Sequence, residues 1–486
     1  MGIRLQPTHA EGHESVFVPG VWLDDERAKC LDGSKPVYYH RPGWGDGARK
    51  WILFYEGGGW CADKHECYDR AKTHLGSSHT YEDTMALEWD MVSSDPETNP
   101  GLHNWNVVFV KYCDGNFWSG ATMDTEEMHD LRLHFRGKFI QEAIMRDLTD
   151  FMGLDKGEEL VFAGCSAGAM IAYLQVDYWA ASGLIPPSVR KVVAVSDSGF
   201  LLDYRGPHEC EHYEDRMRRL WDEVPSVRWV APEECLEDKE GEEWKCLFFA
   251  KYVVPYVKTP LFFIQSKYDK WQREEIVCAP PSDIDTNNNF GRIFEREFWS
   301  VVGHNVKDGY LLDSCAKHCG SWSSVRSEEG MTQQETFQQW YDSLGPSVRV
   351  SPNSTVAKIN EEVVEQQRAY LVAEDDRRLA VGDTDSLNPV EELRRYISSL
   401  VSKQSSFLED ALSIFRFNNT GHFPCDACCE GESEKRRTWG HEDQKHLNTK
   451  MRGAVNAASL QEQRRKKAKE GREAAEMNAM GNMDLL

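Results

Sequence analysis

The sequence lacks any run of about 18 consecutive apolar residues, so we expect no membrane-spanning helix. Its opening stretch, MGIRLQPTHAEGHE, lacks the apolar segment of a secretory signal, and Gln6 stands where N-myristoylation requires Ser or Thr. Basic residues are scarce: 56 Lys and Arg stand against 80 Asp and Glu, a formal net charge of −24. Because such a field repels polyphosphates, we expect neither nucleic acids nor anionic membranes as partners.

Cysteine, in contrast, is plentiful, with 14 residues, several of them at short spacings. An even, clustered number in a large chain indicates an oxidising compartment, with metal ligation as the alternative. We therefore expect a secreted, extracellular or cell-wall protein, although no export signal is visible. A truncated N-terminus or a processed mature chain would account for that difference. The clusters are Cys61 and Cys67, Cys315 and Cys319, and Cys425, Cys428 and Cys429.

The first two thirds of the 486 residues alternate between strand and helix patterns. A helix is predicted over 139–152, where apolar residues recur with helical spacing. Strands alternating with helices imply an α/β fold with a mostly parallel sheet covered by helices on both faces. A polar stretch over 209–246 interrupts the pattern and is interpreted as a cap or surface insertion. The predicted buried strands are 51–55, 107–112, 160–163, 191–195 and 261–264.

A candidate nucleophile lies in Gly164-Cys-Ser-Ala-Gly168, directly after a predicted strand and before a helical run. The pattern G-x-S-x-G between strand and helix is typical of the nucleophile elbow of α/β-hydrolases. Such a sharp turn lifts the hydroxyl of Ser166 above the sheet and directs the amide of Ala167 at a substrate oxyanion. The pentapeptide also occurs by chance in ordinary tight turns, so the interpretation as a nucleophile elbow depends mainly on the predicted strand and helix that flank it.

A glycine run, Glu56-Gly-Gly-Gly-Trp60, follows an earlier predicted strand. Esterases of this kind take their other oxyanion donors from a glycine-rich loop in that place. A phosphate-binding loop is rejected because no Lys-Ser or Lys-Thr follows the glycines. An ordinary glycine turn is the remaining alternative, and it explains three consecutive glycines poorly.

The acid and base of a catalytic triad should follow the serine in chain order. Asp197 and Asp269 both end predicted strands, and their spacing alone does not separate them. The candidate bases are His304, His318 and, further away, His422. His318 lies between two cysteines, in a loop that disulfides could hold rigid, as a general base requires. From these patterns alone the choice stays open.

Taken together, the motifs resemble the pectin acetylesterase family, which also includes the animal carboxylesterase Notum. The likeness covers roughly residues 15–345, and the ordered set is far more specific than any single motif. The matching stretches are Cys30-Leu-Asp-Gly-Ser, Glu56-Gly-Gly-Gly-Trp-Cys61, Leu75-Gly-Ser-Ser78, Asn104-Trp-Asn106, Lys111-Tyr-Cys-Asp-Gly115, Phe135-Arg-Gly137, Gly164-Cys-Ser-Ala-Gly168, Ser196-Asp-Ser-Gly-Phe200, Tyr268-Asp-Lys-Trp-Gln272, Ser314-Cys-Ala-Lys-His-Cys319 and Trp340-Tyr-Asp342.

The resemblance implies an α/β-hydrolase-like fold and a Ser-His-Asp esterase that uses no metal and no organic cofactor. It places the nucleophile at Ser166, the base at His318 and the acid at Asp269. It assigns the oxyanion donors to the amides of Gly58, Gly59 and Ala167, and makes Asp197 structural. It also suggests a Cys61–Cys67 disulfide, with Cys30–Cys113 and a bridge holding Cys315 near His318 as further possibilities.

The chain departs from the family pattern in three places: Ala169, where many relatives have a third glycine, Lys267 and Gly320. We expect three parts: a catalytic domain over 15–345, a helical Cys/His-containing extension over 346–452 and a polar, helical or disordered tail over 453–486. In the extension, Cys425, Cys428 and Cys429 with His422, His441 and His446 offer zinc ligands. Their spacing matches no standard zinc finger, so disulfides or free thiols are favoured.

The resemblance leaves two substrate classes. Plant-type members remove acetyl groups from pectin-like polysaccharide, and Notum-like members remove a long acyl chain from Wnt proteins. The motif strings favour the plant type, so the expected partner is an acetylated polysaccharide, with an acylated protein second. The net charge of −24 suits a polyanionic substrate poorly unless the cleft is basic. A catalytically silent binding protein is the third hypothesis, and it conflicts with the presence of every triad and oxyanion residue.

Overall fold

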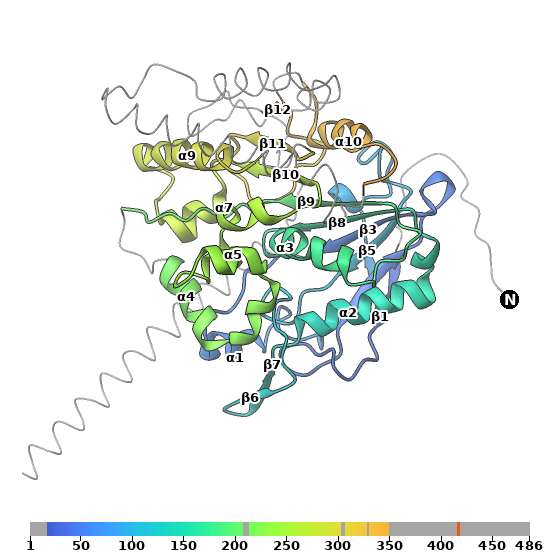
Figure 1. Ribbon diagram of the computed structural model, residues 1–486, viewed down its shortest axis with the longest axis horizontal. Helices are drawn as coiled ribbons and strands as arrows, with labels where there is room; N and C mark the ends of the chain where they lie inside the picture. Colours follow the sequence, from blue (N-terminus) through green and yellow to red (C-terminus); the bar gives the residue numbers. More distant parts are fainter. Residues whose placement is uncertain (1–16, 208–212, 303–306, 328–329, 349–415, 418–486) are drawn as a thin grey trace, which may run out of the picture. The chain divides into compact units, whose positions relative to one another are not determined.

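The computed structural model describes residues 17–207, 213–302, 307–327, 330–348 and 416–417. Their centre is a ten-stranded sheet with the order β12-β11-β10-β9-β8-β3-β5-β2-β1-β4 (Figure 1). The first seven strands in that order are mutually parallel. Their bounds are β12 (Arg416–Phe417), β11 (Gly309–Asp313), β10 (Leu261–Ser266), β9 (Lys191–Asp197), β8 (Glu159–Cys165), β3 (Lys50–Tyr55) and β5 (Asn106–Val110). The five predicted strands are thereby confirmed as β3, β5, β8, β9 and β10.

The other end of the sheet is antiparallel. It is built from β2 (Val37–Arg41), β1 (Phe17–Trp22) and β4 (Thr84–Ala86), and a separate hairpin joins β6 (Thr125–Met128) to β7 (Leu131–His134). The sequence predicted none of these strands. In β1 the reason is Pro19 and Gly20, two residue types that normally argue against a strand interior.

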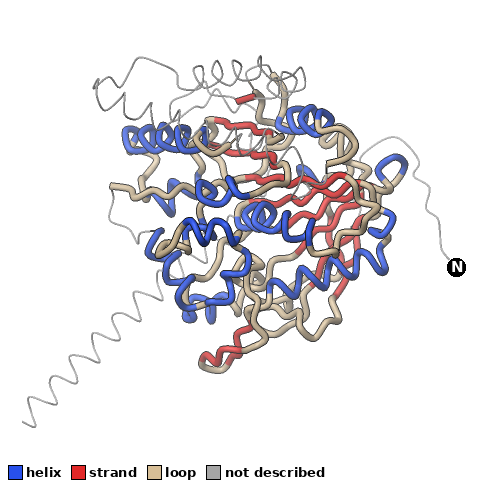
Figure 2. Tube along the Cα trace, viewed as in Figure 1, coloured by secondary structure: helices blue, strands red, loops and turns tan. Residues whose placement is uncertain are grey.

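Helices cover both faces of the parallel strands, because neighbouring residues of a strand point to opposite sides. Phe263 of β10 meets Tyr173 of α3 (Ala167–Ala181) and Phe298 of α9 (Ile284–Trp299). Its neighbour Phe262 meets Trp340 of α10 (Gln333–Ser343) on the other face. Figure 2 shows the strands together in red with the blue helices around them. The predicted two-sided α/β architecture is confirmed.

The predicted helix over 139–152 is found as α2 (Gly137–Asp147), continued to Met152 by one wider helical turn. The predicted insertion over 209–246 lies between β9 and β10, and four helices of the described chain lie in it or directly after it. They are α4 (Tyr213–Glu223), α5 (Glu233–Asp238), α6 (Lys245–Phe248) and α7 (Ala250–Val253). A disulfide between Cys235 and Cys246 links α5 to α6, and Phe248 of α6 stacks on Trp60 beside the glycine run. The insertion therefore covers the neighbourhood of the candidate oxyanion loop.

The region expected to form the C-terminal extension contributes to the same sheet. Val348 bridges to Lys191 of β9, and β12 pairs in parallel with β11. Most of the extension and all of the expected tail lie outside the described residues, so the predicted domain boundaries stay predictions. Among the residues that the structure describes, no helix is long and apolar enough to cross a membrane.

Candidate active site

Ser166 lies in the turn that joins β8 to α3, as the strand-turn-helix prediction required. Its backbone has φ +56° and ψ −121°, a conformation that non-glycine residues adopt rarely and that is typical of functional sites. Both flanking glycines are needed for close packing. A Cβ on Gly164 would lie 2.3 Å from the carbonyl carbon of Gly168, and a Cβ on Gly168 would lie 2.2 Å from the carbonyl oxygen of Tyr55. The turn therefore sits directly against the end of β3.

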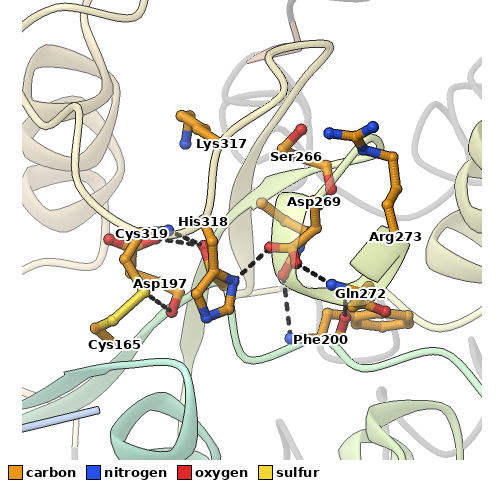
Figure 3. A network of polar contacts seen from close by, with 12 residues as sticks. Cys165, Asp197, Phe200, Ser266, Asp269, Gln272, Arg273, Lys317, His318 and Cys319 are labelled. Atoms are coloured by element: carbon orange, nitrogen blue, oxygen red, sulfur yellow. Dashed lines mark hydrogen bonds and ion pairs between the residues drawn. A yellow bond between two sulfur atoms is a disulfide. The ribbon is translucent and has the colours of Figure 1, made fainter. Parts of the chain in front are cut away.

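Asp269 and His318 are brought together from the ends of two parallel strands. Asp269 follows β10 and begins the short helix α8 (Lys270–Gln272), where its Oδ1 accepts a hydrogen bond from the amide of Gln272 at 2.9 Å. Its Oδ2 lies 2.8 Å from Nδ1 of His318 (Figure 3). The Asp269 carboxylate is fully buried. A carboxylate at this distance holds the ring proton on Nδ1 and leaves Nε2 as the basic nitrogen.

The basic nitrogen of His318 has no hydrogen-bond partner among the described residues. Nε2 is buried and makes no hydrogen bond within the described part of the chain, including to Ser166. Nucleophile–base hydrogen bonds are often long in unliganded enzymes and shorten when substrate binds. Ser166 and His318 nevertheless belong to one site, because the residues next to them, Cys165 and Cys319, form a disulfide with Cα atoms 5.8 Å apart. The bridge expected near His318 is thus made by Cys319; Cys315 is also disulfide-bonded.

The glycine loop is fixed through its carbonyl oxygens. The guanidinium of Arg70, at the end of α1 (Lys64–Arg70), donates to the carbonyls of Gly58 at 2.5 Å and Gly59 at 3.3 Å. The hydroxyl of Tyr112 also donates to Gly59, at 2.7 Å. Because N–H and C=O point in opposite directions across a trans peptide, the amides of Gly59 and Trp60 point away from Arg70. The sequence analysis assigned no role to Arg70, which lies in none of the quoted motifs, or to Tyr112, which lies in the matching stretch Lys111-Tyr-Cys-Asp-Gly115.

The predicted oxyanion donors are free to bind. The amides of Gly58, Gly59 and Ala167 donate to no acceptor among the residues described here. Gly58 and Gly59 have φ of +150° and +61°, which a side chain would strain. The Cys61–Cys67 disulfide, suggested by the resemblance, is confirmed and closes the segment between this loop and α1. Cys30–Cys113 is confirmed as well.

An aromatic cluster, Trp60, Tyr213, Phe248 and Trp271, adjoins the imidazole. The Trp271 ring lies 6.0 Å from that of His318, and Trp60 lies 6.2 Å from both Trp271 and Tyr213. The indole Nε1 atoms of Trp60 and Trp271 and the hydroxyl of Tyr213 are buried without hydrogen-bond partners among the described residues. A ligand next to His318 would therefore meet apolar rings that carry three unused polar atoms.

The competing acid, Asp197, makes no hydrogen bond to the imidazole of His318. Its carboxylate accepts hydrogen bonds from the amide of Gly320 at 2.9 Å and the hydroxyl of Ser198 at 2.9 Å. Burial raises the pKa of Asp197 to about 6, against the opposing effect of the Lys317 ammonium. Of the two aspartates that spacing could not separate, only Asp269 is hydrogen-bonded to His318.

The other candidates lie outside the described residues: His304, His422, and the possible zinc ligands Cys425, Cys428, Cys429, His441 and His446. Within the described ranges, no group of three or more His, Cys, Asp or Glu side chains is arranged to hold a metal ion. The three departures from the family pattern are accommodated locally. Ala169 packs against Gly199, Lys267 pairs with Glu295 at 3.2 Å, and Gly320 has φ +77°.

Comparison with known proteins identifies relatives over the same region. The model of the family described as pectinacetylesterase matches residues 13–351. Pectin acetylesterase 5 of Arabidopsis thaliana is 33% identical over 347 residues, covering 66% of this chain and 78% of the relative. The palmitoleoyl-protein carboxylesterase NOTUM of Schmidtea mediterranea is 29% identical over 331 residues, covering 64% and 60%. The structure of the Wnt deacylase Notum from Drosophila superposes with a TM-score of 0.60 at 25% identity, over 70% of this chain and 97% of that one.

Proposed function

Because the chain belongs to the pectinacetylesterase family, we propose that Ser166, His318 and Asp269 carry out its carboxylic ester hydrolysis through an acyl-enzyme. Ser166 Oγ attacks the ester carbonyl while Nε2 of His318 takes the hydroxyl proton. Asp269 keeps the other ring proton on Nδ1 and stabilises the imidazolium. The tetrahedral oxyanion accepts hydrogen bonds from the amides of Gly58, Gly59 and Ala167. His318 then protonates the departing alcohol, and water hydrolyses the acyl-serine by the same steps.

One observation carries this proposal: the 2.8 Å hydrogen bond between buried Asp269 and His318, beside the Cys165–Cys319 bridge that joins the base loop to the serine turn. A histidine oriented by a carboxylate next to a serine in a sharp turn is the arrangement that acyl transfer requires. The unpartnered amides of the glycine loop support the same chemistry, since a tetrahedral oxyanion would satisfy them.

We propose an acetyl ester of a polysaccharide, such as pectin, as the preferred substrate. The plant pectin acetylesterases match a larger share of their own length than the planarian NOTUM does, 78% against 60%. Removal of a lipid from a protein is the second candidate, favoured by the fold match to Drosophila Notum.

The proposed setting is extracellular. Four disulfides with both partners described, Cys30–Cys113, Cys61–Cys67, Cys165–Cys319 and Cys235–Cys246, favour an oxidising compartment. We propose residues 15–345 as the catalytic domain, followed by an extension over 346–452 and a tail over 453–486. The mechanism assigns no step to a metal or an organic cofactor.

The test is hydrolysis of p-nitrophenyl esters from acetyl to octanoyl by the full chain, by Ser166→Ala and by Ser188→Ala. Ser188 is a half-buried serine whose hydroxyl donates to the carbonyl of Asp155, so it controls for loss of a serine hydroxyl. We expect the highest kcat/KM on acetyl, loss of more than about 1,000-fold in Ser166→Ala and no loss in Ser188→Ala. A preference for octanoyl would select the lipid alternative. A folded wild-type chain without activity on any ester would favour a silent binding protein.

A further inference from the structure

The nucleophile and the base come from strands that are not neighbours. Ser166 follows β8 and the His318 loop follows β11, and the sheet order places β9 and β10 between them. The loop must therefore cross the ends of two strands to bring its imidazole to the serine. Whatever holds the loop in that position also sets the distance across which the proton moves.

Asp197, at the end of the intervening strand β9, contacts both sides of this gap. Its backbone carbonyl accepts a hydrogen bond from the amide of Ser166 at 2.8 Å. Its side-chain Oδ2 accepts one from the amide of Gly320, two residues beyond His318, at 2.9 Å. One residue thus fixes the backbone of the nucleophile turn with its main chain and the backbone of the base loop with its carboxylate.

Ser198 completes the connection. Its hydroxyl accepts a hydrogen bond from the amide of Cys319 at 2.8 Å and donates to Oδ1 of Asp197 at 2.9 Å. Both carboxylate oxygens of Asp197 therefore hold the base loop. Oδ2 binds the amide of Gly320 directly, and Oδ1 acts through the hydroxyl of Ser198. The Cys165–Cys319 disulfide crosses the gap at the same place.

The loop that these contacts hold has an unfavourable backbone. Cys319, Gly320 and Ser321 are three consecutive residues with positive φ, at +60°, +77° and +78°. Residues in this region persist when the surroundings over-determine them. The two amide hydrogen bonds to Asp197 and Ser198, and the disulfide at Cys319, are contacts of that kind on this segment.

We propose that Asp197, with Ser198 and the Cys165–Cys319 disulfide, is the positioning residue that sets His318 against Ser166. The inference rests on the proposed roles of those two residues and goes beyond them. It assigns a function to the second aspartate, which is not the residue proposed as the triad acid. Effects of such a residue appear in kcat, because an imidazole displaced by about 1 Å can cost 100-fold in rate while leaving substrate binding intact.

The first test compares Asp197→Asn with Asp308→Asn on p-nitrophenyl acetate. Asparagine keeps one acceptor oxygen, so either the Gly320 amide or the Ser198 hydroxyl faces an N–H donor. Asp308 is a matched control, since it is buried and accepts from a backbone amide, that of Leu261, at the opposite end of the strands. We expect kcat to fall about 10- to 100-fold in Asp197→Asn with KM within about threefold, and both constants to stay near wild type in Asp308→Asn.

The second test asks whether Asp197 acts through the histidine. In a His318→Ala background, Asp197→Asn should cause no further loss of kcat, because no imidazole remains to be positioned. Ser198→Ala removes one hydroxyl with little change of shape and should also lower kcat. It therefore tests the inference even if Asp197→Asn folds poorly. The pair Cys165→Ser/Cys319→Ser should also lower kcat, because it removes the covalent link between the base loop and the serine turn.

Wild-type kcat in folded Asp197→Asn and Ser198→Ala would overturn the inference, and so would an equal fold-loss with and without His318. Failure of the proposed function has a different signature. If Ser166→Ala or His318→Ala keeps full activity, the catalytic roles themselves are wrong. If both abolish activity while the Asp197 and Ser198 variants are normal, only the positioning role is wrong.

Discussion

Four aspartates lie at or just beyond the carboxyl ends of the parallel strands, and each accepts a backbone N–H. Asp114 accepts from the amide of Trp118, Asp197 from Gly320, Asp269 from Gln272 and Asp313 from Cys315. Each carboxylate therefore anchors a loop at the edge of the sheet where the site lies. Only Asp269 also reaches a histidine. These four residues therefore share the role of anchoring a loop. Asp269, the proposed triad acid, differs from the others in that it also binds His318.

Asp114 offers a test of this anchoring through pH. Burial raises its pKa from 3.8 to about 7, and its Oδ2 has no partner among the described residues. Because the folded-state pKa lies above the unfolded one, the stabilising contribution is complete below about pH 4 and is lost as pH rises through 7. At pH 9 the ionised group costs on the order of 4 kcal/mol relative to the neutral one. We expect the stability of Asp114→Asn relative to wild type to rise between about pH 4 and pH 7 and to level off above that.

Urea unfolding of both chains at pH 4.5, 7 and 9, with the disulfides intact, measures this difference. Asp124→Asn, an exposed aspartate in the next loop segment, controls for the loss of one negative charge. A difference between wild type and Asp114→Asn that is the same at every pH would contradict the expectation. It would mean that Asp114 is ionised in the folded protein across the whole range.

At this scale the sequence could identify Ser166 but could not choose its partners. The serine carries a local signal, two glycines at fixed offsets, whose physical cause is the close packing of the turn against β3. Asp197 ends one parallel strand and Asp269 follows shortly after another, so local sequence gives them similar surroundings. What separates them is the path of the His318 loop across the sheet, which no local pattern encodes. The family resemblance supplied that choice, and the contact between Asp269 and His318 agrees with it.

Helix α3 is packed closely against the strands beside it and the turn that follows β9. It follows Ser166 and runs over β8 and β9, and its first turn contains Ala169 where many relatives have glycine. A Cβ placed on Gly199, just after β9, would lie 2.6 Å from the Cβ of Ala169. The methyl group on the helix is therefore accommodated by the missing side chain on the facing turn.

This pairing predicts a non-additive pair of substitutions. Gly199→Ala should cost about 2 kcal/mol through overpacking, and Ala169→Gly about 1 kcal/mol through helix propensity. The double variant should cost less than the sum by about 0.5 to 1 kcal/mol, because the glycine in the helix makes room for the new methyl group. The rescue is partial, since Ser196 Oγ also lies 2.6 Å from that Cβ position. Urea unfolding of the four chains gives the coupling, and strict additivity would contradict the packing argument.

Whether a strand could be predicted depends on whether its cause is local in the sequence or lies in distant residues. The strands β3, β5, β8, β9 and β10 are short apolar runs because they are buried on both faces, and such runs are visible in sequence. The hairpin of β6 and β7 is largely exposed and carries no such run. The two residues of β12 are too few to form a pattern, and they become a strand only by pairing with β11.

For the whole molecule, the open question is how an acidic chain meets its substrate. A formal charge of −24 repels a polyanion such as partly acetylated polygalacturonan at long range. Neutral acetylated polysaccharides and small esters are not subject to that repulsion. The charge says nothing about the chemistry at Ser166, which is the same for any acetyl ester. It acts instead on the concentration of substrate near the site, and therefore on KM.

We expect the KM for acetylated polygalacturonan to fall several-fold between about 20 and 300 mM NaCl, because salt shortens the Debye length from roughly 20 Å to less than 10 Å and screens the repulsion. The kcat should change little, and acetylated xylan, a neutral polymer, should show no salt dependence of KM. Steady-state acetate release from the two polymers makes the comparison. A KM for the polyanion that rises with salt would mean that local basic groups attract it despite the net charge, and the long-range repulsion would then not govern binding. Equal insensitivity of both polymers would instead show that the acidic groups lie far from the path of the substrate.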